Sequence, residues 1–327
     1  MKTIYKIKRL LSEIRSFGYM LINKKESLVW DISVTDVCNA RCIFCPYQYK
    51  KPTGRVVSFK EVEKFLKIAR IFNVKKINFT PLTGDALLDK DLLLKGKLVK
   101  KYRFKSYLFT NGIRLNKFSC NDLFSSFDSI HISMGGLERG IYKKTYGVDE
   151  FDTVFNNLKE LVKYKEMTNS KVEIHIEFRE ISPYSFMKAE LYGQVKNWIE
   201  KGLIRVGTFE SFDSIHETIN LPFMNIRSKP YLLALRKYFP CKQLKVFALM
   251  HNGDIRMCNC VTSDPINLQS DDLLVGNIKD TEIGSWKRIL EDKTKRSRAL
   301  WRKNKIPEQC RACTLYSPAW ANTKNIG

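Results

Sequence analysis

Three cysteines stand within eight residues, in the C-x3-C-x2-C pattern of Cys38, Cys42 and Cys45. Three thiolates at this spacing can hold three irons of a four-iron, four-sulfur cluster and leave the fourth iron open. An open metal position is typical of a catalytic site, whereas four protein ligands close a structural one. The alternative is a zinc ion with a distant fourth ligand, although none of the four histidines lies close in the sequence.

A second group of cysteines lies in the C-terminal third of the chain. Cys241, Cys258, Cys310 and Cys313 supply four thiolates there, and Cys260 is a fifth candidate. Their spacing allows either a zinc ion or an iron–sulfur cluster.

The segments that must position these cysteines alternate between strand and helix patterns. Six strands are predicted, at 27–35, 75–81, 103–112, 127–136, 171–180 and 203–211. Helices follow the first five, at 58–71, 87–101, 117–126, 151–166 and 185–200. Ser58 and Glu61 form a capping-box pair at the start of the first helix. The alternation predicts parallel strands with right-handed crossovers, hence an α/β barrel or sheet with active groups at the carboxyl ends of its strands.

The fifth strand has one polar face, formed by Glu173, His175, Glu177 and Arg179. Strands of a parallel sheet that helices cover on both sides are usually apolar on both faces. The pattern therefore indicates either an interior lined for a ligand or an edge strand that faces solvent.

The alternation stops after residue 210, and a domain boundary is predicted near 215–235. The segment that follows Cys241 is typical of a β-hairpin with Asn252 and Gly253 as its turn. At the other end, residues 2–21 form a basic amphipathic pattern, which predicts a helix that packs on the body or contacts a membrane surface or an acidic partner.

The composition excludes several classes of protein. The chain of 327 residues is 44% hydrophobic, which argues against disorder, and it has no apolar run near the ~20 residues of a membrane span. Its net charge of +23 favours anionic partners of some kind. No secretory segment is recognised, so the nine cysteines favour metal over disulfides, and Cys120, which stands alone, is interpreted as a buried apolar residue.

Cys38, Cys42, Phe44 and Cys45 form the C-x3-C-x-aromatic-C signature, and the chain here resembles radical S-adenosylmethionine (SAM) enzymes. The resemblance covers about residues 27–212 and implies a partial (β/α)6 barrel. It also implies that SAM binds the open iron of a [4Fe–4S] cluster and is cleaved to a 5′-deoxyadenosyl radical, which abstracts hydrogen from a substrate.

Further positions match the SAM site of this family. The stretch Thr83, Gly84 and Asp85 corresponds to a Gly-Gly-Glu turn that holds the methionine amino group, with the shorter Asp85 as a departure. The resemblance also assigns cofactor contacts to Asn111, in the Thr-Asn-Gly stretch that ends the third strand, and to Ser133, which ends the fourth.

The C-terminal cysteines resemble the SPASM/Twitch extension of radical SAM enzymes, in which four cysteines hold one auxiliary [4Fe–4S] cluster. Cys258 is preferred to Cys260 as a ligand because it stands five residues after Gly253, as in the family. The predicted domains are a basic N-terminal helix at 1–26, a radical SAM core at 27–215 and a SPASM/Twitch-like domain at 216–327.

These expectations describe a cytoplasmic radical SAM oxidoreductase with peripheral membrane contact through its basic helix as an option. It would dehydrogenate an anionic small-molecule or glycan-like substrate and take electrons from a flavodoxin or ferredoxin. Arg179, Glu177 and His175 are the candidate catalytic residues. The alternatives are a maturase of a ribosomally made peptide, an RNA-modifying enzyme and, from another class, a zinc-stabilised nucleic-acid-binding protein. High charge alone does not favour nucleic acid, because no RNA-binding module is recognised.

Overall fold

The computed structural model describes residues 28–49, 51–81, 83–179, 185–208, 235–258, 271–311, 313, 315–316 and 318. The predicted N-terminal helix, Cys260 and most of the predicted boundary region lie outside these ranges. Within them, no helix is both long enough and apolar enough to cross a membrane.

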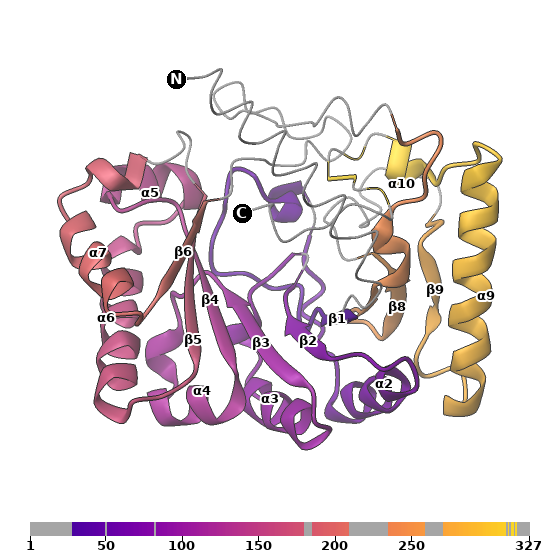
Figure 1. Cartoon of the computed structure of the whole chain (residues 1–327), viewed down its shortest axis with the longest axis horizontal. Coiled ribbons are helices and arrows are strands. Elements are labelled where there is room, and N and C mark those ends of the chain that lie inside the picture. The colour runs from indigo at the N-terminus through magenta and orange to yellow at the C-terminus, as the bar shows by residue number, and fades with distance from the viewer. Residues whose placement is uncertain are drawn as a thin grey trace.

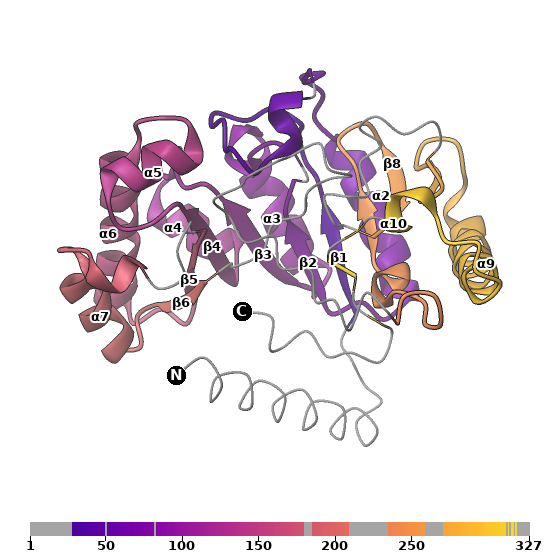
Figure 2. The ribbon, with the colours of Figure 1, turned by 90° about the horizontal axis from the view of Figure 1, so that it is seen from above.

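Nine strands form one sheet in the order β6-β5-β4-β3-β2-β1-β7-β8-β9. The six predicted strands are all present, and each pairs in parallel with its neighbour along the chain. Figures 1 and 2 show the curve of this sheet. The strands are β1 (Val29–Ile32), β2 (Lys76–Phe79), β3 (Lys105–Thr110), β4 (Ser129–Met134), β5 (Glu173–Phe178), β6 (Arg205–Thr208), β7 (Phe247–Leu249), β8 (Asp254–Met257) and β9 (Leu274–Asn277).

Helices lie along the outer face of the six parallel strands (Figure 2). The described helices are α2 (Phe59–Ile71), α3 (Leu92–Lys101), α4 (Cys120–Ser126), α5 (Arg139–Tyr146), α6 (Phe151–Thr168), α7 (Tyr192–Glu200), α9 (Ile283–Arg302) and α10 (Glu308–Arg311). The predicted capping box of α2 is confirmed, since Ser58 and Glu61 bond each other's backbone N–H groups.

Several helix predictions were wrong in detail. The helices predicted at 117–126 and 185–200 begin only at Cys120 and Tyr192, each after a 3-10 turn. The predicted helix at 87–101 begins only at Leu92, because a 3-10 turn at Ala86–Leu88 comes first. The short helix α5 was missed, since it spans only eight residues and Gly140 and Thr145 weaken its helical propensity.

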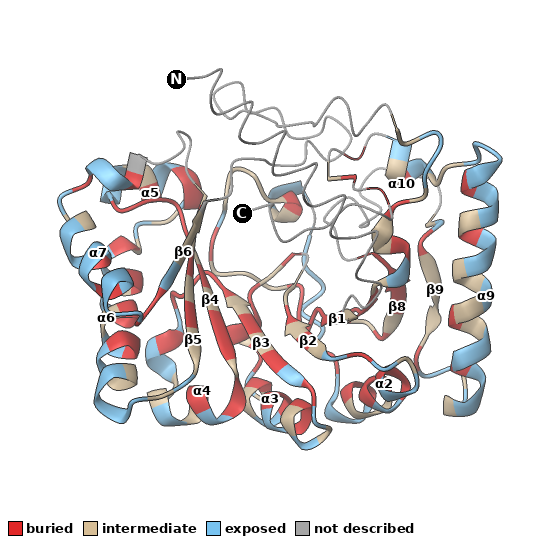
Figure 3. Cartoon of the chain, in the orientation of Figure 1, coloured by how far each residue is buried: buried red, intermediate tan, exposed pale blue. Residues whose placement is uncertain are grey.

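The two faces of the sheet differ, and buried and intermediate residues alternate along several strands in Figure 3. On β1, Trp30 and Ile32 are fully buried, and the Trp30 ring packs against Phe65 of α2. The opposite face carries polar side chains, because residues alternate along a strand. β5 lies between β4 and β6, so the alternative of an edge strand is excluded.

The C-terminal segment continues the same sheet. β7 pairs in parallel with β1, and β7 and β8 form the predicted antiparallel hairpin with its turn at Asn252 and Gly253. α9 contacts α2 on the outside of this extension. The division into a core and a SPASM/Twitch-like domain stays a prediction.

Candidate active site

The three-cysteine loop follows β1 and rests on the end of α5. The N–H groups of Arg41 and Ile43 donate to the carbonyl oxygens of Tyr146 and Thr145, at 2.9 and 3.0 Å. These two bonds hold the loop between Cys38 and Cys45 against a helix that is 105 residues further along the chain (146 − 41).

The three thiols form a donor set that fits an iron–sulfur cluster. Burial, with the nearby charges of Asp85 and Cys45, raises the pKa of Cys38 to about 12. Burial also raises the pKa of Cys42, as do Cys45 and Cys38. The neighbouring thiolates thus oppose one another's ionisation, and a bound cation would relieve this. Binding of iron would displace the thiol protons.

Asn111 joins this loop to the end of β3. Its side-chain amide donates to Asn39 Oδ1 at 2.8 Å and approaches Cys38 Sγ at 3.9 Å. Its backbone N–H donates to Asp85 Oδ2 at 2.7 Å. Asn111 therefore lies at the predicted cofactor site and contacts one predicted cluster ligand.

Both oxygens of the Asp85 carboxylate accept hydrogen bonds within the protein. Oδ1 accepts from the N–H of Leu87, Oδ2 accepts from the N–H of Asn111, and the Thr110 hydroxyl lies within 3.0 Å of both oxygens. Asp85 is 4% exposed. In this arrangement Asp85 positions the ends of β2 and β3, while its predicted contact with the methionine amino group stays a prediction.

The predicted turn at Thr83 and Gly84 packs directly against the start of the cysteine loop. Gly84 has φ +120°, and a Cβ there would lie 2.6 Å from the carbonyl oxygen of Thr35 and 2.9 Å from that of Val37. Only glycine fits both the backbone conformation and this close approach.

Arg179 reaches back from the end of β5 to the cysteine loop. Its Nε donates to Ser133 Oγ at 2.6 Å, and its guanidinium lies over the Phe44 ring at 5.4 Å. Phe44 in turn packs edge-on against Tyr146. The structure thus brings Phe44, Ser133 and Arg179 together beside Cys42, whose pKa the Arg179 charge lowers against the larger effect of burial.

Glu177 and His175 lie on the same inner face, further from the cysteines along β5. Glu177 pairs with His131 of β4, whose Nδ1 is 3.7 Å from Glu177 Oε1. The sequence reasoning missed His131. The pattern that could have identified it is the one that identified His175. Ser129, His131 and Ser133 alternate with buried apolar residues along β4.

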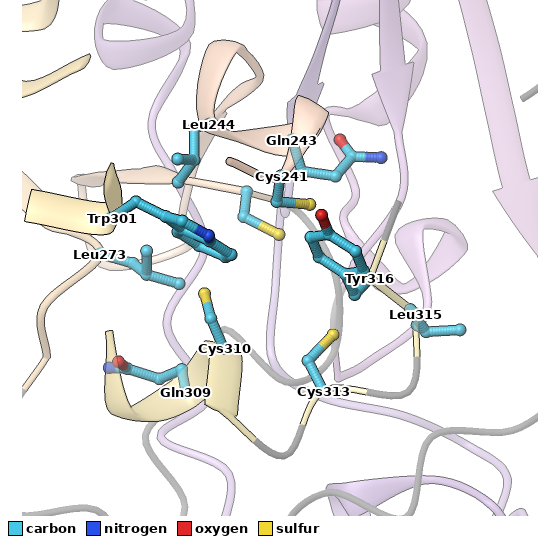
Figure 4. A pocket seen from close by; sticks show the side chains of 11 residues that line it. Cys241, Gln243, Leu244, Leu273, Trp301, Gln309, Cys310, Cys313, Leu315 and Tyr316 are labelled. Carbon is cyan, nitrogen blue, oxygen red and sulfur yellow. The ribbon is translucent and has the colours of Figure 1, made fainter. Parts of the chain in front are cut away.

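Four C-terminal cysteines line one pocket, as predicted. Cys241, Cys258, Cys310 and Cys313 surround it together with Trp301, Tyr316 and other side chains; Figure 4 labels three of the four cysteines. Burial raises the pKa of Cys310, and so do the other three thiols. Cys258 thus lies with the other three cysteines, while its preference over Cys260 as a cluster ligand stays a prediction.

Arg236 holds one side of this pocket. Its guanidinium donates to the carbonyl oxygens of Arg311 and Cys313 and lies over the Tyr316 ring. Its own carbonyl accepts from Trp301 Nε1 at 2.6 Å. No local pattern could have found Arg236, because its partners lie 65 or more residues away in the sequence.

The comparisons agree with this fold. Residues 32–174 match the Radical SAM superfamily. A "Probable GTP 3′,8-cyclase" of Thermococcus kodakarensis is 29% identical over 134 residues, which are 41% of this chain and 43% of that protein. The chain thus spans less than half the length of the curated relatives it matches.

Two solved structures share the fold over most of the chain. BtrN in complex with AdoMet and 2-DOIA has a TM-score of 0.53 at 14% identity, covering 88% of this chain and 93% of its own. Native anSMEcpe with bound AdoMet and Kp18Cys peptide has a TM-score of 0.52 at 17% identity, covering 88% of both chains.

The family match and the cysteine loop within it identify residues 32–174 as a radical SAM domain. Such a domain implies SAM and a [4Fe–4S] cluster as cofactors.

Proposed function

We propose that this enzyme dehydrogenates a hydroxylated, anionic small-molecule or glycan-like substrate. Cys38, Cys42 and Cys45 would hold the catalytic cluster, and Phe44, Thr83, Gly84, Asn111 and Ser133 would surround SAM, with Asp85 as a support. The cluster, when bound, supplies the electron that cleaves SAM to the radical that takes a hydrogen atom from the substrate.

The observation that carries the proposal is the second set of four converging cysteines. An alcohol that loses a hydrogen atom must still lose one electron and one proton to become a carbonyl compound. An auxiliary [4Fe–4S] cluster at these cysteines supplies an acceptor for that electron. Four protein ligands leave such a cluster no open iron, so a purely electron-accepting role suits it.

The spacing of the sulfur atoms supports iron–sulfur rather than zinc. Four thiolates around one zinc ion, at Zn–S distances near 2.3 Å, bring the sulfurs to about 3.8 Å from one another. Among the described residues, the one group of three or more ligand atoms within 4.8 Å of one another is His131, His175 and Glu177, and it contains no cysteine. A wider spacing of sulfurs suits a four-iron cluster, and it disfavours the zinc-stabilised nucleic-acid-binding protein.

The proposed substrate class rests on the net charge of the chain and on the side chains that line the inner face of the sheet. The net charge of +23 favours an anion, and the inner face of the sheet offers hydrogen-bonding side chains. The structure of BtrN with 2-DOIA supports a small ligand, that of anSMEcpe with a peptide supports the maturase alternative, and the cyclase relatives suggest a nucleotide. All three enter the test as probes. A flavodoxin or ferredoxin is proposed as electron donor.

The test measures 5′-deoxyadenosine formed by the anaerobically reconstituted, reduced full chain. The probes are soluble-metabolite and lipid extracts of the source cells, glucose 6-phosphate, GTP and a ribosomally made precursor peptide. We expect an anionic, hydroxylated probe to stimulate formation and to yield a product two hydrogens lighter. Stimulation by the peptide alone, or by GTP with a product of unchanged oxidation level, would overturn the proposal in favour of that class.

Matched cysteine variants separate the two clusters. Cys42→Ala should abolish SAM cleavage, and Cys310→Ala should keep cleavage but lose the oxidised product. Cys120→Ala is the control, because Cys120 lies on α4 and belongs to neither set of cysteines. Iron analysis should give about eight irons per wild-type chain and about four for Cys310→Ala. Zinc in place of the second four irons would contradict the proposal of an auxiliary cluster.

A further inference from the structure

Three rings form a stack across the inner face of the sheet. Phe109 of β3, His131 of β4 and His175 of β5 occupy the same register on neighbouring parallel strands. Their ring centroids are 4.2 Å apart between Phe109 and His131 and 4.3 Å apart between His131 and His175, with interplanar angles of 17° and 13°. Strands lie about 4.8 Å apart, so planar side chains at one register stack face to face.

The stack argues against a metal site, although His131, His175 and Glu177 have ligand atoms within 4.8 Å of one another. A metal ion lies in the plane of each imidazole that binds it, because the nitrogen lone pair lies in that plane. Two nearly parallel, stacked planes meet only far from both rings. Both histidines therefore cannot ligate one ion unless a ring turns out of the stack.

The contacts of His131 describe a path for a proton instead. Its Nε2 lies 3.1 Å from Ser129 Oγ. Its Nδ1 is buried without a hydrogen-bond partner among the described residues and faces Glu177 Oε1 at 3.7 Å. A buried ring nitrogen without a partner is costly, and a role in proton transfer explains such an exception.

Glu177 stands between this nitrogen and the open side of the sheet. Its side chain is 23% exposed, against 12% for His131. The neighbouring position on β6 is Gly207, where a Cβ would come within 3.1 Å of Glu177 Oε2. The absence of a side chain at 207 leaves room beside the carboxylate.

The surrounding charges favour the ionised carboxylate of Glu177 and the neutral ring of His175. The titratable and charged side chains that face the pair are Tyr107 from β3, Glu173, His175 and Arg179 from β5, and Arg205 from β6. Burial raises the pKa of Glu177, but His131, Arg179 and His175 outweigh it and hold that pKa below its usual range. Burial lowers the pKa of His175, and so does the charge of His131. Two stacked imidazolium rings would repel each other.

We propose that Glu177 and His131 form a proton-accepting pair for a hydroxyl group of the substrate. The substrate O–H bond breaks, the proton binds the Glu177 carboxylate, and it then moves to Nδ1 of His131, where an N–H bond forms. Glu177 is the catalytic residue of the pair, and His131 is a positioning residue that acts through it. His175 and Phe109 hold the His131 ring in place. The inference rests on the proposed dehydrogenation, which releases a hydroxyl proton.

The first test follows the protons directly and needs no substrate. The full chain contains four histidines, so ¹⁵N-imidazole spectra of the reconstituted protein can be assigned by single substitutions. We expect Glu177→Gln to shift the Nδ1 resonance of His131, because it removes the carboxylate charge that lies 3.7 Å from this nitrogen. An unchanged His131 signal in Glu177→Gln would overturn the pair.

The second test compares two ring-preserving variants. His131→Phe and His175→Phe both keep an aromatic ring in the stack, where Phe109 already fits. With the probe that best stimulates 5′-deoxyadenosine formation, His131→Phe should keep that formation but lower the ratio of oxidised product to 5′-deoxyadenosine by about 10²-fold, the scale of acid–base catalysis. His131→Phe should also change the pH dependence of this ratio, whereas His175→Phe, which removes only a ring that supports His131, should change the ratio and its pH dependence far less.

The outcomes separate the two proposals. If no probe yields an oxidised product, the dehydrogenation fails together with the pair. If an oxidised product forms and both ring variants keep the wild-type ratio and pH profile, the pair alone is overturned. Uptake of Zn²⁺ by the cluster-loaded wild type, lost in His131→Phe, His175→Phe and Glu177→Gln alike, would replace the pair with a metal site. If His131→Phe fails to fold, Glu177→Gln takes its place, and the ratio of oxidised product to 5′-deoxyadenosine is compared with that of the wild type in the same way.

Discussion

At the scale of single residues, Asp85 has a structural task beside the cofactor contact that the family resemblance predicts. Its oxygens accept hydrogen bonds from Leu87, Thr110 and Asn111. Burial raises the pKa of Asp85 against these hydrogen bonds. Its value to the site lies in fixing Asn111 beside Cys38.

We therefore expect Asp85→Asn to destabilise the chain by about 1–3 kcal/mol, because an amide offers one acceptor oxygen and turns an NH₂ group toward buried donors. Urea unfolding of the cluster-free chain measures this, and iron content after reconstitution should fall as the cysteine loop loses its support. Asp149→Asn is the control, since Asp149 forms exposed ion pairs with Arg139 and Lys143 and should matter little. Equal losses in both variants would contradict the positioning role.

At the scale of elements, the helices on the outer face are anchored by more than apolar packing. Lys95 of α3 is 1% exposed, and its Nζ lies 2.5 Å from Asp89 Oδ2. Asp89 Oδ1 also accepts from the N–H of Asp91 at 3.0 Å, just before the helix begins. The buried pair thus ties the segment before α3 to the first turn of the helix.

Lys95→Met should lower the free energy of unfolding by about 3–5 kcal/mol, because it leaves the Asp89 carboxylate buried without its partner. Urea unfolding checks the value. The exposed Lys97→Met on the same helix should have a far smaller effect, since Lys97 pairs with Asp122 at the surface. If Asp89→Asn combined with Lys95→Met is no more stable than Lys95→Met alone, the unpaired charge is not the cause.

At the scale of the whole molecule, α2 connects the barrel strands to the C-terminal extension. Glu61 caps α2 through Ser58, and its Oε1 lies 3.3 Å from Lys279 Nζ, in the segment after β9. A Cβ at Gly253, in the hairpin turn, would lie 2.8 Å from the same oxygen. One carboxylate thus contacts three segments that are far apart in the sequence.

This contact predicts a pH dependence of stability. Burial raises the pKa of Glu61, but the hydrogen bonds from Ser58 and the charge of Lys279 outweigh it and lower that pKa in the folded chain. The contribution of the Glu61 carboxylate to the free energy of unfolding should be present above its pKa in the unfolded chain, about 4.3. It should be lost as the pH falls through its lower pKa in the folded chain. Wild type should therefore exceed Glu61→Gln in stability at neutral pH, and the difference should shrink in acid.

Urea unfolding over a series of pH values measures the difference. Lys279→Met removes only the distant partner and should reproduce part of the neutral-pH loss, while the backbone cap from Ser58 remains. A difference between wild type and Glu61→Gln that is equally large in acid would show that the carboxylate charge plays no part.

The sequence by itself determined the features that depend on neighbours along the chain. The three-cysteine loop after β1, the capping box of α2, the alternation that orders six parallel strands and the hairpin turn at Gly253 all follow from local spacing. The alternation of polar and apolar residues along β5 was enough to show a polar inner face, because successive side chains of a strand point to opposite faces.

Only the tertiary structure decided which distant groups meet. Strand register stacked His131 on His175, and the sheet extension beyond β1 brought Cys241 and Cys258 to Cys310 and Cys313. Asp85 shows the same limit, since its role depends on donors from β3 that no spacing rule links to it. Contacts between strands and across the sheet are set by packing of the whole chain, so their partners and their chemistry emerge only once it has folded.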